Sequence, residues 1–296
     1  MSKSPGQQPS KSAEDTITVR RMAFAFPEGL DPVVIEGYPE ESYFFIGLSL
    51  LLPYLEPYLI RSMREAKKRV TDPALVADID LFNAQEGQHY RQHTVFNEAI
   101  RPAGLEALTA LEAEISADYR RFTETRSLRF NLAYAEGFEA FTTAVSRFAF
   151  ETRQFDRVHP AAVRDLFQWH IVEELEHRTV TFDVYNHVCG GYFYRLAVGI
   201  FAQWHLNRFA LRVANALQGH DPEGFRKKYG GRRAAWTRVR PLLWLAVRLL
   251  FPKLFATYLP WYTPHTIPLP AVASTLAKRY SEMALAAAPA GKSASA

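Results

Sequence analysis

The chain has almost none of the features that mark secreted or membrane-spanning proteins. It contains one cysteine, Cys189, among 296 residues, which excludes an internal disulfide framework and makes a reducing, cytoplasmic setting the expectation. Residues 1–16 are polar, rich in Ser, Lys, Gln and Pro, and lack the apolar core of a signal peptide, so a disordered tail is expected. No long stretch alternates apolar and polar residues, which argues against a β-sheet and favours an all-α protein.

Negative charge is scarce in the last third of the chain. Residues 190–296 contain 15 Lys and Arg against 3 Asp and Glu, whereas residues 1–189 contain 20 against 28. The basic part also holds four of the five tryptophans, which together with its apolar runs favours an anionic membrane surface over nucleic acid as a partner. We therefore expect residues 191–260 to contact a membrane peripherally, on the inner membrane, without spanning it.

Two copies of a Glu-x-x-His step stand out among the polar residues. They are Glu86 to His89 and Glu174 to His177. On a helix, residues three apart share a face, so each step directs one carboxylate and one imidazole toward the same point. One such step is common by chance, but a second copy in a similar setting points to a shared metal site.

An acid precedes each step by about one helix length, within an apolar stretch. Glu56 lies 30 residues before Glu86, and Glu139 lies 35 residues before Glu174, although Glu136 competes with Glu139 for this role. A Glu from each of two helices and Glu-x-x-His from two others is the ligand pattern of ferritin-like bundles that hold two iron or manganese ions. The sequence therefore predicts a ferritin-like four-helix bundle over residues 17–190, with an extended N-terminal arm and further apolar, basic helices over residues 191–283.

Other polar residues near these steps have predicted roles around the metals. His93 lies only about 20° around the helix from Glu86 but about 10 Å along it, so it is expected to line the pocket, as is His170, and both are candidate catalytic residues. Glu173 and Asp183 are candidates to hold the outer ring nitrogen of a ligand histidine. Glu176 is expected to face solvent.

The helix boundaries follow from proline, glycine and capping residues. A first helix is expected from Glu40 or Glu41 to about Val70, either starting near Pro53 or kinked there. The other expected helices are 73–100, 105–154 with a break at 125–127, 160–188, 192–217, and an interfacial helix over 239–260. Residues 218–233 are expected to form a linker, and the Ala-rich tail from Ala284 to be disordered.

The chain also resembles a known family. Its segments 19–24, 48–53, 86–93, 169–177 and 182–185 are similar to the bacterial family named predicted metal-dependent hydrolase, which is grouped with ferritin-like helical proteins. That resemblance implies that the metal ligands are Glu56, Glu86, His89, Glu139, Glu174 and His177. The sequence departs from the resemblance at Ala140, where family members often carry a histidine.

Four buried acids in a bundle favour an enzyme that activates O₂ on two iron ions, an oxygenase or oxidase acting on a small apolar substrate with an electron-donor protein. Aromatic side chains close to the ligands are expected to line its cavity, namely Phe82, Tyr90, Tyr134, Phe138, Phe141 and Tyr185. The alternatives are a two-metal hydrolase, with manganese or zinc in place of iron, and a metal-binding or membrane-associated protein without turnover. A homodimer is left open.

Overall fold

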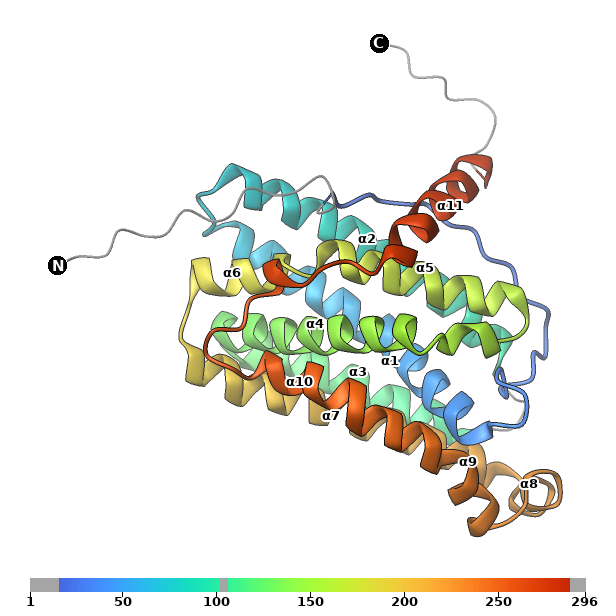
Figure 1. Cartoon of the computed structure of the whole chain (residues 1–296). Helices are drawn as coiled ribbons and strands as arrows, with labels where there is room; N and C mark the ends of the chain where they lie inside the picture. The colour runs from blue at the N-terminus through green and yellow to red at the C-terminus, as the bar shows by residue number, and fades with distance from the viewer. Residues whose placement is uncertain (1–15, 102–105, 288–296) are drawn as a thin grey trace.

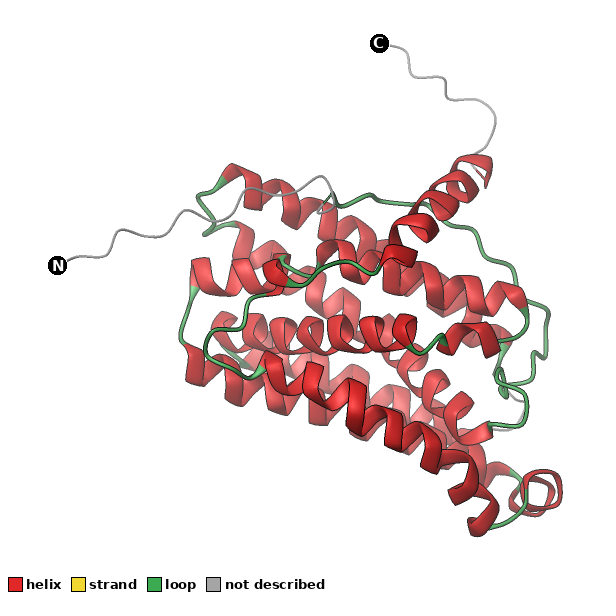
Figure 2. Ribbon diagram, viewed as in Figure 1, coloured by secondary structure: helices red, strands yellow, loops and turns green. Residues whose placement is uncertain are grey.

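The computed structural model describes residues 16–101 and 106–287, and these residues are mostly helical (Figures 1 and 2). Over these two ranges the only β-pairing is a single isolated bridge between Ile35 and Val158. The all-α class is confirmed. The helices are α1 (Pro39–Lys67), α2 (Pro73–Ala99), α3 (Glu106–Thr125), α4 (Leu128–Glu151), η2 (Gln154–Arg157), α5 (Ala161–His177), α6 (Val180–Val188), α7 (Tyr192–His220), α8 (Pro222–Tyr229), α9 (Arg232–Leu245), η3 (Ala246–Leu250), α10 (Phe251–Thr257), η4 (Pro264–Thr266) and α11 (Ala271–Ala287).

Local signals set several of the boundaries as predicted. Asp72 caps α2, because its carboxylate accepts a hydrogen bond from the Ala74 amide at 2.9 Å. The break expected at 125–127 separates α3 from α4, and Ser127 caps α4 through the Phe130 amide. The helix expected over 160–188 is instead divided into α5 and α6 at residues 178–179.

The first helix runs through both of its prolines. α1 begins at Pro39, close to the expected Glu40 or Glu41, so the alternative of a start near Pro53 is wrong, and it continues past Pro57 to Lys67. Pro53 has no amide hydrogen and cannot donate to the carbonyl of Ser49, four residues earlier. That carbonyl instead accepts a hydrogen bond from the side-chain amide of Asn97 on α2, at 3.0 Å. The proline therefore directs a backbone acceptor of α1 toward α2.

The helices that carry the predicted ligands, α1, α2, α4 and α5, lie together, with α7 packed against α1 and α4 (Figure 1). Two glycines allow this close approach: a Cβ atom at Gly137 would lie 2.4 Å from the Cα of Gly199, and one at Gly47 would lie 2.5 Å from the carbonyl oxygen of Ala210. The predicted separation into a bundle and an extension, and the specific ferritin-like four-helix arrangement, stay predictions.

The N-terminal arm is extended and lies across α2 and α5, as predicted. Gln92 of α2 binds the arm through two hydrogen bonds. Its side chain accepts from the Phe24 amide at 2.9 Å and donates to the Met22 carbonyl at 2.8 Å. The tail expected over residues 1–16 lies outside the described residues except for Thr16.

Two segments of the C-terminal part are more helical than expected. The expected linker contains α8, which is capped by Asp221, and the Ala-rich segment is helical to Ala287 within α11. α11 packs on α5, where Arg279 forms a bidentate ion pair with Asp165 at 2.9 Å. The expected interfacial helix over 239–260 corresponds to α9, η3 and α10. The residues after Ala287 lie outside the described residues.

One described helix, α1, is long and apolar enough to cross a membrane, but 67% of its apolar window is buried inside the protein. The core helix of a soluble protein passes the same test, so this is weak evidence for a membrane span.

Candidate metal centre

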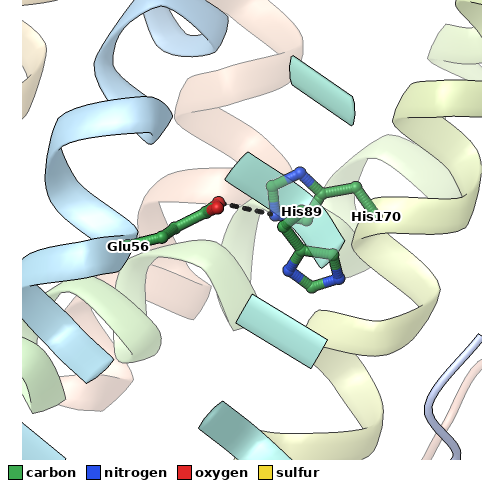
Figure 3. A group of neighbouring side chains, drawn as sticks. All are labelled: Glu56, His89 and His170. Atoms are coloured by element: carbon green, nitrogen blue, oxygen red, sulfur yellow. Dashed lines mark ion pairs between the residues drawn. The ribbon is translucent and has the colours of Figure 1, made fainter. Parts of the chain in front are cut away.

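Helices α1, α2, α4 and α5 direct seven carboxylate and imidazole side chains into one buried space. They are Glu56, Glu86, His89, Glu139, His170, Glu174 and His177, and each is at most 6% exposed. Three groups hold their ligand atoms within 4.8 Å of one another: Glu56, His89 and His170; Glu86, Glu139 and His177; Glu86, His89 and Glu174. Figure 3 shows Glu56 from α1 pointing toward the two imidazoles of its group. All six residues predicted as ligands therefore lie together, and His170 joins them.

The spacing of the donor atoms suits metal coordination. The Nε2 atom of His177 lies 3.5 Å from Glu86, 3.4 Å from Glu139 and 3.6 Å from Glu174. The Nδ1 atom of His89 lies 3.7 Å from Glu86 and 3.6 Å from Glu174. Two donors that each lie about 2.1 Å from one cation are about 3.4 Å apart at a tetrahedral angle. The atoms are thus too far apart for good hydrogen bonds but correctly spaced to share a cation.

Most of these inward atoms have no hydrogen-bond partner. They are both carboxylate oxygens of Glu56, Glu86 and Glu139, Oε2 of Glu174, Nδ1 of His89 and Nε2 of His177. A buried polar atom without a partner is costly, and so many in one place are rare in a folded protein. Divalent cations would satisfy all of them, so the residues present fit a metal site.

The electrostatics of the metal-free cluster are unfavourable. Burial, reinforced by the neighbouring carboxylates, raises the pKa of Glu56 and Glu139 well above 4.5 and that of Glu86 to about 8. Burial also acts to raise the pKa of Glu174, but His177 and His170 outweigh it and bring that pKa well below 4.5. The carboxylates of this cluster cannot all be ionised unless positive charge is present.

Outer contacts fix the tautomers of two histidines so that a lone pair faces the cluster. Nε2 of His89 lies 3.0 Å from the Glu173 carboxylate, which can only accept, so Nε2 carries the hydrogen and Nδ1 is free. Nδ1 of His177 donates to the side-chain oxygen of Gln85 at 2.9 Å, which leaves Nε2 free. Glu173 therefore takes the outer role predicted for it.

A hydrogen-bonded chain fixes the third histidine in the same way. The Ser49 hydroxyl donates to Asn97 at 2.6 Å, so it accepts from Nδ1 of His93 at 2.8 Å. Nε2 of His93 then accepts from Nδ1 of His170 at 2.7 Å, so Nε2 of His170 is the ring nitrogen that faces the cluster. That nitrogen lies 3.7 Å from Glu56, the pair marked in Figure 3, and 2.9 Å from Glu174. Both nitrogens of His93 are engaged, so His93 supports His170 and lies outside the ligand groups.

The N-terminal arm holds these outer contacts in place through Arg20. Its guanidinium pairs with Glu173 at 3.1 Å and with Glu176 at 2.7 Å. Glu176 is 8% exposed and also accepts from Gln85 at 3.0 Å, so the prediction that it faces solvent is wrong: the arm covers this side of α5. No periodicity could have revealed Arg20, because it lies in an extended segment far from α5 in the sequence.

Two acids considered for the site are engaged elsewhere. Glu136 pairs with Arg195 of α7 at 2.7 Å, whereas Glu139, one helical turn further on, reaches His177. Asp183 pairs with His265 at 2.8 Å and is not the outer partner of a ligand histidine. Glu139 is thus the fourth carboxylate of the cluster.

The fold and the site define an all-α protein with a buried carboxylate and imidazole cluster that is built to hold cations. The chain belongs to the predicted metal-dependent hydrolase family, whose model matches residues 18–267. This confirms the resemblance found in the sequence. No match was found among curated proteins or among solved structures.

Family membership overturns the predicted reaction. The expectation of an O₂-activating di-iron oxygenase is wrong, because the family is one of predicted metal-dependent hydrolases. Metal dependence agrees with the ligand groups of the structure, but neither finding supports a pair of iron ions. Dioxygen and an electron donor are expected only as parts of an oxidative reaction, and a hydrolase needs neither.

Proposed function

We propose that this protein is a metal-dependent hydrolase whose reaction takes place at the buried cluster. The observation that carries the proposal is the set of inward carboxylate and imidazole atoms without hydrogen-bond partners, in a chain that belongs to a family of predicted metal-dependent hydrolases. When bound, divalent cations in such a site lower the pKa of a water molecule and polarise a substrate oxygen, which is the chemistry that hydrolysis requires.

The charge of the cluster supports two cations. Four carboxylates and three neutral imidazoles balance two divalent ions, and mixed oxygen and nitrogen ligands suit manganese or zinc. Glu139 and His177 would hold one ion, and Glu56, His89 and His170 the other. Glu86 and Glu174 each lie within 3.7 Å of both His89 and His177 and would complete the ligand sets.

The remaining residues would orient these ligands and exclude water. Glu173 and Gln85 hold the protons on the outer nitrogens of His89 and His177, so that the inner nitrogens stay available. His170 and His93 both line a neighbouring cavity, as predicted, and of the two only His170 also belongs to a ligand group, so it would lie beside both the metal and a bound substrate. His93 acts through His170 and is a positioning residue.

The proposal is tested by stripping the protein with a chelator, reloading it with zinc or manganese, and assaying a panel of carboxylic and phosphoric esters. We expect hydrolysis that depends on the added metal, and a loss of at least about 100-fold in kcat for Glu86→Gln. Glu98→Gln is the matched control, since Glu98 lies on the same helix and its side chain is 67% exposed. Metal-replete protein without hydrolytic activity, or equal activity in both variants, would rule the function out.

We also propose that the protein contacts membranes peripherally through an aromatic face on α7, α9, η3 and α10. The exposed aromatic side chains of these elements, which we call the aromatic face, are Phe193, Trp204, Trp236, Trp244, Phe251 and Phe255, each at least 56% exposed. α7 and the α9 to α10 segment run along the same side of the molecule (Figure 1), and Tyr258 donates a hydrogen bond to Gln203 between them. Large exposed apolar patches mark interaction surfaces.

The charge around the aromatic face favours a lipid surface over a second protein chain. Arg248 lies over the ring of Trp244 at 4.5 Å, and Arg208 lies over Trp204 at 5.7 Å. Residues 190–296 carry a net charge of +12, from 15 Lys and Arg against 3 Asp and Glu. Tryptophan and arginine together suit the boundary between lipid headgroups and acyl chains.

Flotation with vesicles of anionic phospholipid tests this contact. We expect the protein to float with anionic vesicles, and the double variant Trp244→Ser with Phe251→Ser to stay in solution. The control is Leu81→Ser with Val95→Ser on α2, two exposed apolar residues away from the aromatic face. Equal flotation of both variants, or a stable dimer in solution that the first variant dissociates, would contradict membrane contact.

A further inference from the structure

A narrow apolar cavity opens beside the metal centre, between α1, α4 and α5. Its volume is about 90 Å³, and at one end it is lined by His170 and Glu174 of the cluster. The walls are mainly aromatic and aliphatic side chains, among them Phe45, Leu48, Phe138, Phe141, Val145 and Phe167. Of the aromatic residues that the sequence suggested as cavity lining, Phe138 and Phe141 take that position.

The polar residues of the wall are mostly satisfied by other contacts. Ser49 is bonded to His93 and Asn97, and Thr142 donates to the carbonyl of Glu139 at 3.1 Å. Ser146 is 1% exposed, and its hydroxyl has no partner. The lining residues outside the metal cluster include no lysine, arginine or aspartate. A charged group bound here would lose its hydration without compensation.

We propose that this cavity binds the acyl chain of the substrate, so that the enzyme hydrolyses uncharged esters of short aliphatic carboxylic acids. The inference rests on the hydrolase function proposed above and adds the class of substrate. With the chain in the cavity, the ester carbonyl lies beside His170 and Glu174. Water adds to the acyl carbon, the ester C–O bond breaks, and a carboxylic acid and an alcohol leave, without an oxidant or a reductant.

The size of the cavity limits the chain. An apolar cavity of about 150 Å³ holds one benzene molecule. The smaller volume here therefore suits an aliphatic chain of a few carbons better than a ring system. Each methylene buried in such a cavity tightens binding about fourfold until the space is filled.

Binding of linear primary alcohols to the metal-loaded protein, measured by calorimetry, tests the cavity without relying on turnover. We expect affinity to rise about fourfold per added methylene and then to level off. Val145→Phe, which narrows the cavity, should weaken binding of the longer alcohols at least about tenfold. Val95→Phe is the matched control, because Val95 is exposed on α2.

A second variant guards against misfolding of the first. Ser146→Ala removes the unpartnered hydroxyl without adding bulk, so it should fold normally and keep the rise of alcohol affinity with chain length. Affinities that do not change with chain length, or an equal response of both phenylalanine variants, would overturn the inference.

Hydrolysis of p-nitrophenyl esters with acyl chains of increasing length separates the two proposals. Rates that follow the alcohol affinities, and fall in Val145→Phe, support both. Ester hydrolysis at rates that do not depend on acyl-chain length supports the hydrolase function but contradicts the proposal that the cavity binds the acyl chain. If alcohol affinity follows the expected pattern but the protein hydrolyses none of the esters, the cavity binds aliphatic chains and the hydrolase function is contradicted.

Discussion

Two neighbouring acids on α4 show how one helical turn separates a ligand from a structural residue. Glu136 and Glu139 are both buried, but Glu136 faces Arg195 and Glu139 faces His177. Substitutions of the two residues should therefore have different effects on metal binding and stability. Glu139→Gln should lower bound metal and activity, because it removes a ligand charge. Glu136→Gln should leave bound metal unchanged but cost about 3 kcal/mol of unfolding free energy, because the Arg195 guanidinium would stay buried without its partner.

Metal analysis of the two purified variants, with denaturant unfolding of each, checks this pair. Loss of metal from Glu136→Gln at intact stability would reverse the assignment.

Asn97 acts on the cluster from a distance. It anchors Ser49, which orients His93, which in turn holds Nε2 of His170 toward the carboxylates. We expect Asn97→Ala to weaken metal affinity by about 10-fold to 100-fold, as is typical when an outer partner of a ligand is removed. Competition with a chromogenic chelator measures the effect. Asn207→Ala is the control, since Asn207 bonds only within its own helix, to the Gln203 carbonyl, and unchanged affinity in both variants would refute the relay.

The inner ligands could be predicted from the sequence, but the residues that hold them in place by hydrogen bonds could not. Glu86, His89, Glu174 and His177 follow from the three-residue helical spacing, which is a local property. Arg20, Gln85 and Asn97 reach the cluster only through contacts between distant segments, so no local pattern reveals them. Glu176 was misjudged for the same reason, because the arm that covers it lies 156 residues away in the sequence.

At the scale of helices, the contact between α4 and α7 depends on two facing glycines. A methyl group at Gly137 would overlap the backbone of Gly199, which cannot move without shifting the whole helix. Gly137→Ala should therefore cost about 1–3 kcal/mol, as overpacking does. Gly219→Ala on α7 is the control: a Cβ there meets nothing within 4 Å, so the change should be neutral or slightly stabilising.

Urea unfolding of both glycine variants measures the difference. Equal midpoints would mean that α4 and α7 can separate without cost.

Prediction of helices from the sequence succeeded where capping signals are local and failed where tertiary contacts decide. Asp72 and Ser127 cap the N-termini of α2 and α4, at the boundaries expected before residue 73 and at 125–127. Pro53 does not stop α1, and α2 supplies the donor that the helix lacks at Ser49. The alanine-rich end of α11 extends a helix that is anchored on α5 through Arg279, and alanine has the highest helix propensity, so the helix continues to Ala287 although its last residues are exposed.

At the scale of the whole molecule, the buried acids couple folding to pH and metal. Without cations, the pKa of Glu86 is raised by burial from 4.5 to about 8, and that of His177 is raised well above 6.5 by Glu174 and Glu139, which outweigh the opposing effect of burial. Both groups hold protons in the folded chain that the unfolded chain releases as pH rises. Stability of the metal-free protein should therefore fall between pH 6.5 and about 8.

His93 and His170, whose pKa values are lowered by burial, oppose this trend only below 6.5, where the unfolded chain would bind protons. We expect the Tm of the chelator-treated protein to drop by at least about 4 °C across this window, and that of the metal-loaded protein to stay level, because cations replace the protons. Calorimetric scans at both pH values measure this. A metal-free Tm that rises toward alkaline pH would contradict the electrostatic description of the cluster.

The position of Trp169 gives the protein its own optical reporter. Its indole is fully buried, donates to Glu173 at 2.9 Å and has its ring centre 4.9 Å from that of His89, whereas the other four tryptophans are more than half exposed. Its fluorescence emission should therefore lie at shorter wavelength, at the blue edge of the spectrum, than the emission of the exposed tryptophans. Paramagnetic manganese entering the centre would quench that blue edge and diamagnetic zinc would not, so a simple titration can follow filling of the site and distinguish the two ions.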